Sequence, residues 1–406
     1  MLTSQQMQVV PRKFNSFPFE YHRELEVRID NITNLGLGVG RHDGWVIMVP
    51  GVAIGEHIRC RIYRNHSNYS EADLVEILEP SPKRITPKCP LFGVCGGCQY
   101  QHLSYETQLE LKQRQVKELL QKLAGIDSEV ALPLSTNQIY HYRSKLTPHF
   151  EREAQSIGFL KMGSRFAIVD VEQCCIATPA INEKLKILRQ EIRQKTFRLG
   201  GTLLLRDTGN SVETDPAKVI TQHIGSWIFQ VYAGEFFQNN SYILPHFVDY
   251  IIRESSGNGI EFLLDMYCGV GVFGICSSRN FRTVTGIEIN ERAIQLARQN
   301  AVNNRRDNIQ FIAGSSENIF AKTLPEAKKT TVILDPPRKG CDSYFLRQLV
   351  AFEPKKIVYI SCSPDTQARD VKFLLQHRYA IHRVQPFDLF PQTRHIENVI
   401  TLFSCQ

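Results

Sequence analysis

The sequence predicts an α/β protein with a mostly parallel sheet in its second half and a small β-barrel near its start. From Phe236 onward, short apolar strands alternate with helical stretches, which is the order of a doubly wound sheet. From Glu24, four β-rich runs are separated by glycine, proline and asparagine turns, which is typical of a small antiparallel barrel. With 406 residues, the chain is long enough for two or three domains.

Composition places the chain among ordinary globular proteins. Hydrophobic residues make up 42% and charged residues 22%, so neither a disordered nor a fibrous chain is expected. The sequence contains no run of 18 apolar residues and no signal-peptide pattern, which predicts a cytoplasmic protein without membrane contact. Lys and Arg exceed Asp and Glu by 48 − 41 = 7 charges, a mild excess that fits a polyanionic partner without requiring one.

The first 80 residues divide into a tail and the predicted barrel. Residues 1–19 carry turn formers and charges without periodicity, which predicts a poorly ordered tail. Residues 20–80 are predicted to form the barrel. Within one of its strands, Arg59, Arg61 and Arg64 share a face that suits equally a solvated surface or phosphate binding.

Residues 81–232 are predicted to form a central α+β domain. Ser104 is expected to cap a helix whose apolar stripe follows 3.6-residue spacing and which Gly125 ends. A second helix is expected in INEKLKILRQEIRQ, with strands such as GFLKMG and TLLLRD around it. Residues 233–406 then form the domain that contains the parallel sheet.

A glycine loop in the last domain predicts a nucleoside site. The strand FLLDMY runs into Cys268-Gly269-Val270-Gly271, and doubly wound sheets bind ligands at the carboxyl ends of their strands. The next strand ends at Glu288, which is placed to accept hydrogen bonds from both ribose hydroxyls. A structural turn is the alternative for the glycines alone. The loop lacks the G-x-G-x-x-G pattern of dinucleotide binders, which favours S-adenosylmethionine over NAD.

Three further residues are candidates for chemistry. In ILDPPRKG, two prolines fix the backbone after Asp335 and hold its carboxylate at the sheet edge. Cys362 follows the strand IVYIS, where a thiolate can add to an electron-poor ring carbon. Glu397 stands near His395 among apolar residues and could act as a general base. Each has an ordinary alternative interpretation: the Asp335 segment as a plain loop, Cys362 as a buried strand-end cysteine, and Glu397 as part of a surface ion pair.

Three of the eleven cysteines, Cys89, Cys95 and Cys98, lie within ten residues. In a reducing compartment, such spacing indicates metal ligands or reactive thiols rather than disulfides. From spacing alone, zinc is slightly favoured over an iron–sulfur cluster.

Together these motifs resemble the uracil-5 RNA methyltransferases, which make 5-methyluridine in ribosomal or transfer RNA. The resemblance covers nearly the whole chain and is carried by CPLFGVCGGCQYQH, FFQNN, LDMYCGVGVFG, ILDPPRKG, YISCSPDTQARD and FPQTRHIENV. It implies a Rossmann-like class I methyltransferase domain at residues 233–406. Residues 20–80, with GLGVGRHDGWVIMVPG, resemble an OB-like, RNA-binding TRAM barrel.

The resemblance implies a role for each candidate residue. Cys362 is the nucleophile that adds to C6 of uracil, and Glu397 is the base that removes the C5 proton after methyl transfer. Lys145 matches a basic position that could stabilise the enolate charge, and Phe236 is expected near the flipped base. The residues that contact S-adenosylmethionine or lie beside the uracil are Gln238, Tyr267, Glu288 and Asp335.

The resemblance also implies a [4Fe–4S] cluster in the central domain. Its ligands would be Cys89, Cys95, Cys98 and a fourth thiolate from the Cys174-Cys175 pair, for which the segment DVEQC favours Cys174. The cluster is expected to be structural, because cysteine-mediated methyl transfer contains no redox step.

The chain departs from the family pattern at three positions. Ser363 follows the nucleophile where asparagine is usual, Val272 follows Gly271 where some members carry asparagine, and Ser315 stands where an acidic or amide residue often contacts the adenine. None of these changes removes a catalytic group, so an active enzyme is expected.

The expected substrate is RNA, with 23S ribosomal RNA favoured, uridine 54 of transfer RNA as the alternative, and a monomer as the working form. One rival interpretation is a methyltransferase acting on an exocyclic amine, which would need neither Cys362 nor Glu397. The other is a non-catalytic RNA-binding protein of ribosome assembly. Trapping with 5-fluorouridine RNA separates them, because only the cysteine mechanism leaves a stable adduct.

Overall fold

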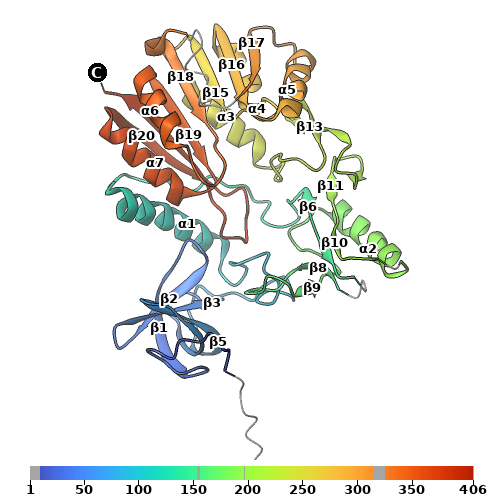
Figure 1. The fold of residues 1–406 in the computed structure, drawn as a ribbon, viewed down its shortest axis with the longest axis vertical. Helices are drawn as coiled ribbons and strands as arrows, with labels where there is room; N and C mark the ends of the chain where they lie inside the picture. Colours follow the sequence, from blue (N-terminus) through green and yellow to red (C-terminus); the bar gives the residue numbers. More distant parts are fainter. Residues whose placement is uncertain (1–9, 153–155, 196, 315–324, 406) are drawn as a thin grey trace, which may run out of the picture. The chain divides into compact units, whose positions relative to one another are not determined.

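The computed structural model describes residues 10–152, 156–195, 197–314 and 325–405 (Figure 1). Its contacts divide the chain into two units. Unit 1 comprises residues 1–111 and 392–394, and unit 2 comprises residues 112–391 and 395–406.

A closed five-stranded barrel forms the N-terminal part of unit 1. The sequence predicts a barrel, but the expectation that it is wholly antiparallel is wrong, because the third and fifth strands pair in parallel, and most of GLGVG belongs to a strand rather than to a turn. The strands pair in the order β1-β2-β3-β5-β4, and apolar side chains such as Leu25, Val27 and Ile29 alternate inward along the first of them. Small residues are needed inside, because a Cβ on Gly38 would lie 2.1 Å from a methyl group of Val52. The bounds are β1 (Glu24–Ile32), β2 (Leu37–His42), β3 (Trp45–Pro50), β4 (His57–Asn65) and β5 (Tyr69–Glu79).

The arginine face of β4 is an ion-paired surface. Arg59 donates to Glu76 at 2.7 Å and to Glu26 at 3.2 Å, and Arg64 lies 3.6 Å from Glu71. Carboxylates therefore neutralise much of this row, which favours the solvated-surface interpretation over phosphate binding.

Helix α1 (Tyr105–Leu119) follows the barrel, and the division between the units falls within it. Ser104 caps it as predicted, with its Oγ accepting the Thr107 N–H at 3.3 Å. The last residues widen into a π-helix over Leu120–Ala124, which ends at Gly125 with φ 69°.

Within unit 1, the first turns of α1 also bind the short segment 392–394. Gln108 Oε1 accepts the Gln392 main-chain N–H, and Gln108 Nε2 donates to Gln392 Oε1, both at 3.0 Å. The Gln392 carbonyl accepts the N–H groups of Gln99 and Tyr100. These buried bonds hold Gln392 at φ 70°.

The first part of unit 2 is an α+β layer. Helix α2 (Pro179–Arg193) covers the small sheets with Ile181, Leu185 and Ile192, and its Arg189 donates two 2.7 Å bonds to Asp170. The sheets pair as β10-β7-β8-β9 and β12-β11-β6. Their strands are β6 (Lys145–Leu146), β7 (His149–Phe150), β8 (Ile157–Leu160), β9 (Ile168–Asp170), β10 (Gly201–Thr202), β11 (Leu205–Asp207) and β12 (Val212–Glu213).

The second part of unit 2 is built on a seven-stranded sheet in the order β17-β16-β15-β18-β19-β21-β20. The first five strands run parallel, whereas β21 pairs antiparallel with both β19 and β20. Every residue of β18 and β19 is buried, which explains the apolar runs Val332–Leu334 and Ile357–Ile360 within them. The strands are β15 (Phe262–Met266), β16 (Thr283–Glu288), β17 (Ile309–Ala313), β18 (Thr330–Leu334), β19 (Lys356–Ser361), β20 (Tyr379–Phe387) and β21 (Glu397–Ser404).

Helices and a hairpin complete this part of the chain, and the alternation of strands and helices confirms the predicted α/β class (Figure 1). The helices are α3 (Leu244–Ser255), α4 (Val272–Ser277), α5 (Glu291–Asn303), α6 (Ser343–Phe352) and α7 (Pro364–Gln376). The hairpin joins β13 (Val219–Ile224) to β14 (Trp227–Tyr232).

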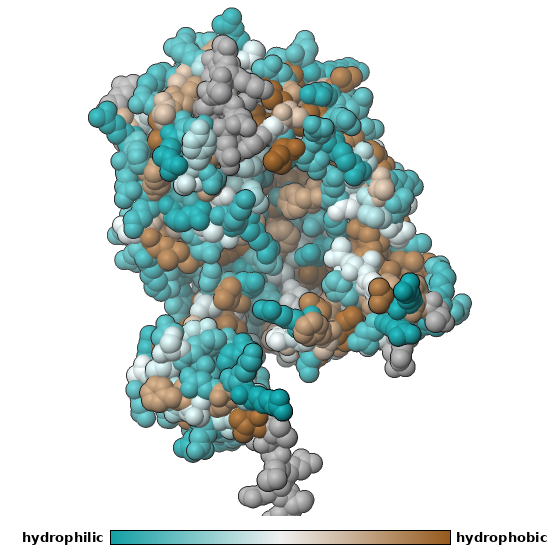
Figure 2. Space-filling view, viewed as in Figure 1, coloured by the Kyte–Doolittle hydropathy of each residue, from teal (hydrophilic) through white to brown (hydrophobic). Residues whose placement is uncertain are grey.

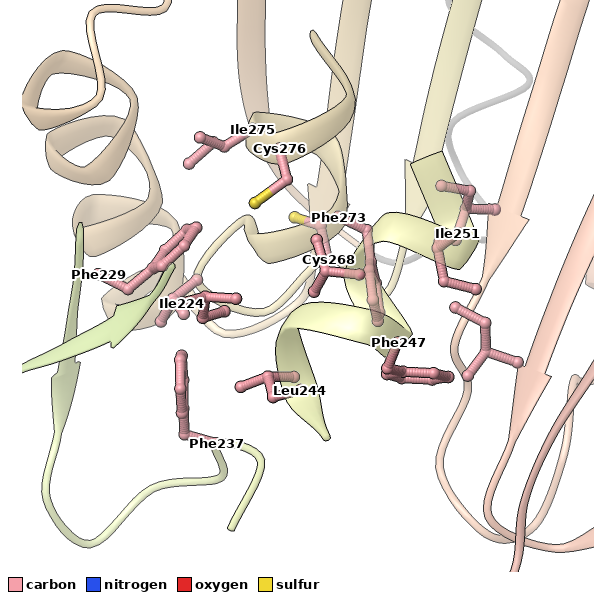
Figure 3. Close-up of a cluster of buried hydrophobic side chains, with 14 of the residues drawn as sticks. Ile224, Phe229, Phe237, Leu244, Phe247, Ile251, Cys268, Phe273, Ile275 and Cys276 are labelled. Carbon is pink, nitrogen blue, oxygen red and sulfur yellow. The ribbon is translucent and has the colours of Figure 1, made fainter. Parts of the chain in front are cut away.

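An apolar core lies beneath the glycine loop. Figure 3 shows Phe247 and Phe273 side by side, with Cys268 and Cys276 among the hydrophobic side chains. Burial raises the pKa of both thiols far above its ordinary value, so these two cysteines are packing residues and not reactive thiols.

The face shown in Figure 2 is largely hydrophilic, with small apolar patches scattered over it. Phe236 is among the exposed aromatic residues, with 72% of its surface accessible. Within the described ranges, every helix is too short or too polar to cross a bilayer.

Candidate active site

The carboxyl edge of the parallel sheet brings the predicted site residues together. β15 ends just before Tyr267, β16 ends at Glu288, β18 ends just before Asp335 and β19 ends just before Cys362. Strand β21 runs the opposite way, so its first residue, Glu397, reaches the same edge. Parallel strands meet with their carboxyl ends at one rim, which is where ligands of doubly wound sheets bind.

The glycine loop is held by the carboxylate of Glu288. One oxygen accepts the Gly269 N–H at 3.2 Å, and the other accepts the Asn290 N–H at 2.9 Å. Gly271 has φ 87°, and a Cβ there would meet the Phe311 ring at 2.8 Å, so the tight turn requires glycine. Each Glu288 oxygen keeps a lone pair for a second donor, which suits a ribose diol.

Asp265 lies fully buried beneath this loop. Its Oδ2 accepts the Gly274 N–H at 2.7 Å, whereas Oδ1 is buried and has no hydrogen-bond partner among the described residues. Burial is the main cause that raises the pKa of Asp265 to about 7, and the nearby carboxylates of Asp335 and Glu288 contribute to the same increase.

The strand register sets Cys362 opposite Glu397. Strands β19 and β21 pair up to Ser361 and Asn398. The next position toward this edge is Cys362, after Ser361, on one side and Glu397, before Asn398, on the other. Gln367 supports this end by donating to the carbonyls of Tyr359 and Asn398, and it accepts the Asn398 amide at 2.7 Å. A thiol and a carboxyl group therefore share one end of two neighbouring strands.

Burial and neighbouring charges set the protonation of this pair. Burial and the Glu397 carboxylate raise the pKa of Cys362 to about 11, whereas the Arg338 guanidinium lowers it. Burial and Asp335 raise the pKa of Glu397 well above its usual value, against the influence of Arg338. Burial raises the pKa of half-buried Asp335 to about 7. Two raised carboxyl pKa values and a thiol at one rim are typical of a catalytic site.

Helix α7 adds a favourable environment for a thiolate. Cys362 immediately precedes its N-cap residue Ser363, and Pro364 occupies the first turn. The N–H groups of a helix N-terminus favour negative charge and lower thiol pKa values.

The loop after Asp335 is held by α7. Asp370 accepts the Cys341 N–H at 2.8 Å and the Tyr359 hydroxyl at 2.7 Å, and Thr366 Oγ1 donates to the Arg338 carbonyl at 3.0 Å. Arg338 was not singled out in the sequence, although a basic residue directly after a strand-end Asp-Pro-Pro is the signal that could have found it.

The ammonium group of Lys145 uses two of its three donors on main-chain carbonyls. It donates to the carbonyls of Gly234 and Glu235 at 2.6 and 3.0 Å. Burial, together with the charges of Arg206 and Arg143, lowers the pKa of Lys145 to about 8. The structure thus gives Lys145 the role of holding the segment before FFQNN.

Buried Arg206 holds the same segment from β11. It donates to the Glu235 carbonyl at 3.0 Å and to Asn239 Oδ1 at 2.9 Å. Between these anchors lie exposed Phe236 and half-buried Gln238, whose amide oxygen is buried without a hydrogen-bond partner among the described residues. Sequence reasoning missed Arg206, because a charged residue in TLLLRD gives no sign of burial.

Among the described residues, the predicted cysteine ligands do not form a recognisable metal centre. Cys89, Cys95, Cys98 and Cys174 are all half-buried, and Gln101 accepts the Cys89 N–H at 3.0 Å. In the part of the chain that the structure describes, no three His, Cys, Asp or Glu side chains are grouped to hold a metal ion. The arrangement therefore does not support the predicted iron–sulfur cluster.

The three departures from the family pattern have different outcomes. Ser363 Oγ donates to Asp365 at 2.7 Å within the first turn of α7, and its N–H donates to Ser361 Oγ. Val272 begins α4. Ser315 lies outside the described residues.

Family models match two parts of the chain. The model described as tRNA (Uracil-5-)-methyltransferase matches residues 217–404, and the TRAM domain model matches residues 20–75. The second match coincides with the five-stranded barrel.

Curated relatives match nearly the whole chain. The tRNA (uracil(54)-C(5))-methyltransferase of Schizosaccharomyces pombe is 38% identical over 95% of this chain and 79% of its own length. The enzyme of that name from Saccharomyces cerevisiae is 32% identical over 94% of this chain and 74% of its own. An uncharacterised RNA methyltransferase of Clostridium tetani is 30% identical over 95% of this chain and 97% of its own.

A solved structure has the same fold over most of the chain. The Pyrococcus abyssi tRNA (uracil-54, C5)-methyltransferase, in complex with S-adenosyl-L-homocysteine, superposes with a TM-score of 0.72 at 27% identity. The match covers 93% of this chain and all of that one. With its TRAM barrel, its class I methyltransferase sheet and these relatives, the chain belongs to the uracil-5 RNA methyltransferase family.

Proposed function

We propose that this enzyme methylates C5 of a uridine in RNA through a covalent bond between Cys362 and C6 of the base. The observation that carries the proposal is the register of β19 and β21, which puts a thiol and a buried carboxyl group opposite each other at the carboxyl edge of the sheet. Because C5 of uracil is a poor nucleophile, a thiol that adds to C6 is what the reaction needs.

Cys362 acts first. Its sulfur forms a bond to C6, and the electron pair of the C5=C6 bond moves to C5 and O4, giving an enolate. Arg338 is the cation beside Cys362 that favours its thiolate over the thiol. Once the uracil has displaced water, the same positive charge favours the enolate.

Methyl transfer to C5 is followed by proton removal. S-adenosylmethionine, when bound, supplies an electrophilic methyl group. Glu397 then takes the C5 proton as a carboxylate, the C5=C6 bond re-forms and the sulfur of Cys362 leaves C6. A raised pKa suits Glu397 to this task, because a carboxylate of higher pKa is a stronger base.

The site's own residues fit S-adenosylmethionine. Glu288 offers a lone pair on each oxygen to a diol, and the glycine turn lets a ligand approach the backbone. The unpartnered oxygens of Gln238 and Asp265 are available to donors, and we assign Gln238, Tyr267, Glu288 and Asp335 to the cofactor or the adjacent uracil.

We propose uridine 54 of transfer RNA as the target. The two fungal relatives and the archaeal structure carry that position in their names, which favours transfer RNA over the ribosomal RNA expected from the sequence. We propose that the barrel at residues 20–80 binds RNA. We propose the central segment 81–232 and the catalytic domain 233–406 as the other functional parts.

Mapping 5-methyluridine in transfer and ribosomal RNA, from cells with and without the gene, tests the target. Loss of the methyl group at position 54 of transfer RNA alone is the expected result. Loss confined to ribosomal RNA would contradict the assignment. A chain carrying Cys362→Ala, returned to the deleted cells, should fail to restore the modification.

A [4Fe–4S] cluster held by Cys89, Cys95, Cys98 and Cys174 stays a prediction, which rests on the resemblance of CPLFGVCGGCQYQH and DVEQC to the iron–sulfur members of the family. No step above depends on it. Iron and sulfide analysis of anaerobically prepared protein should find about four irons per chain. Cys95→Ser should lower the iron content and Cys175→Ser should not. Iron-free protein from the anaerobic preparation would contradict the prediction.

A further inference from the structure

Lys112 is a buried charge that the reaction steps leave unused. Its ammonium group lies 2.6 Å from Asp388 Oδ1, and the side chains of both residues are wholly inaccessible to solvent. The same ammonium donates to the Phe390 carbonyl at 3.3 Å. Replacing a buried ion pair with hydrophobic side chains of similar volume is often neutral or stabilising, so stability alone does not account for this pair.

Asp388 and Phe390 belong to the connection between β20 and β21, which leads into Glu397. Other buried groups of unit 2 hold the same stretch: Asn240 Nδ2 donates to the Leu389 carbonyl at 3.0 Å, and the Tyr142 hydroxyl donates to the Pro391 carbonyl at 2.8 Å. Four consecutive residues, 388–391, are thus each fixed by a contact from another segment.

The neighbouring main chain is fixed as well. The Asp388 N–H donates to the Leu134 carbonyl at 2.8 Å, and the Leu134 N–H donates to the Pro386 carbonyl at 2.9 Å. The last residue of β20, Phe387, pairs with the first residue of β21, Glu397, so the connection starts and ends at one residue pair. A shift of residues 388–391 therefore displaces Glu397 at the first pair of the two strands.

We infer that Lys112 is a positioning residue for the carboxylate of Glu397. By neutralising Asp388 and binding the Phe390 carbonyl, it fixes the direction in which the chain enters β21. The proton on C5 must lie within hydrogen-bond reach of the base, and a displacement of about 1 Å can lower such a rate about a hundredfold. Cys362 follows directly after β19, which is not joined to this connection along the chain, so its addition to C6 should not depend on the connection.

The inference rests on the proposed role of Glu397, and it predicts which step fails. Replacing Lys112 alone would leave the Asp388 carboxylate buried without the lysine charge, so the informative change is the double variant Lys112→Met/Asp388→Leu. Tyr142→Phe, which keeps the ring and loses only the donor to Pro391, is the second variant. Lys117→Met, an exposed lysine on the same helix, is the matched control.

The experiment uses the full chain, a transfer RNA transcript with uridine 54 and labelled S-adenosylmethionine, below the melting temperature of every variant. Denaturing gels follow the methylated covalent adduct and its decay to free RNA. In the double variant we expect decay to slow about tenfold to a hundredfold. Tyr142→Phe should slow it less, Lys117→Met should not slow it, and cofactor affinity and adduct formation on 5-fluorouridine RNA should stay unchanged.

Two results would overturn the inference. Either both folded variants release product at the wild-type rate, or they lose cofactor affinity and adduct formation in equal measure, as a merely structural role predicts. Glu397→Gln separates the two proposals. If it accumulates methylated adduct and the Lys112 and Tyr142 variants do not, only the positioning role fails. If it accumulates none, the role of Glu397 fails, and the positioning role fails with it.

Discussion

Cys362 and Glu397 stand one residue beyond the last paired residues of two neighbouring antiparallel strands. The two strands come from chain segments 36 positions apart, yet hydrogen-bond register sets their side groups at the same edge of the sheet. Charge links them too, because the Glu397 carboxylate raises the pKa of the thiol. Their order of action can therefore be tested by removing one at a time.

Cys362→Ala should abolish methyl transfer and leave S-adenosylmethionine binding nearly intact, because the thiol acts on the base. Glu397→Gln should block the reaction after methylation, so the covalent RNA adduct should accumulate with the methyl group attached. Denaturing gels with labelled cofactor distinguish the two. A Glu397→Gln variant that forms no adduct would remove the proposed base from the mechanism.

The pH dependence of proton removal should reflect the charges around Glu397. As a base, Glu397 must be ionised, so the decay of the methylated adduct should slow as pH falls through its raised pKa. Asp335→Asn removes one cause of the raised Glu397 pKa, so the pH below which adduct decay slows should become lower. Arg338→Met removes the cation that lowers the Glu397 pKa, so the pH below which adduct decay slows should become higher. Lys339→Met, an exposed neighbour, is the control.

Measurement is by a pH jump on adduct formed beforehand, which separates proton removal from thiol addition. Identical profiles for Asp335→Asn, Arg338→Met and the wild type would show that these charges do not act on the base.

Most of the fold could be predicted, because local patterns determine it. The alternation of FLLDMY, TVTGIEI, TVILD and KIVYIS with helical stretches gave the parallel sheet, and the glycine turn followed from spacing. Cys362 and Glu397 could be named from sequence. That the two residues lie opposite each other could not be predicted, because it depends on β21, an antiparallel strand inserted between β19 and β20.

The charged residues that support the site were harder to predict from the sequence than the catalytic candidates. Lys112, Arg206 and Asp388 look like surface residues in the sequence, and their burial depends on partners more than 30 positions away. The resemblance implies that Lys145 could stabilise an enolate charge, and the structure adds two carbonyl partners about 90 positions along the chain that the sequence did not reveal. Such long-range polar contacts leave no local periodicity to find.

Glu288→Ala should weaken S-adenosylmethionine binding by about 1–3 kcal/mol, the usual loss when a charged hydrogen-bond partner is deleted. The loss has two sources, because Glu288 also holds the Gly269 N–H of the turn. Calorimetry measures it, with exposed Glu291→Ala as the control on the following helix. Equal affinity in the Glu288 variant and the wild type would place the ribose elsewhere.

Asp265 should make folding stability depend on pH. Its folded pKa, about 7, lies above the ordinary value of 3.8, so the native state favours the protonated form. The associated stability is fully present below the unfolded pKa and is lost as pH rises through about 7. The loss is on the order of 4 kcal/mol.

Asp265→Asn, which cannot ionise, should flatten this dependence. Unfolding in urea at pH 5 and pH 8 checks it for both chains. A pH dependence as steep in Asp265→Asn as in the wild type would assign the effect to another group.

Lys145→Met should lower the stability of the protein rather than slow the addition of Cys362 to C6 directly. The substitution leaves the carbonyls of Gly234 and Glu235 without their donor and should destabilise unit 2 by about 1–3 kcal/mol. The segment 234–240 would then loosen around Phe236 and Gln238, so affinity for RNA and cofactor should fall.

The alternative, a lysine that stabilises the enolate, predicts normal stability and binding with a slow addition step. Denaturant unfolding and single-turnover rates at saturating RNA separate these outcomes, with exposed Lys161→Met as the control. A folded Lys145→Met chain of wild-type stability that adds to C6 slowly would restore the catalytic role and overturn the supporting one.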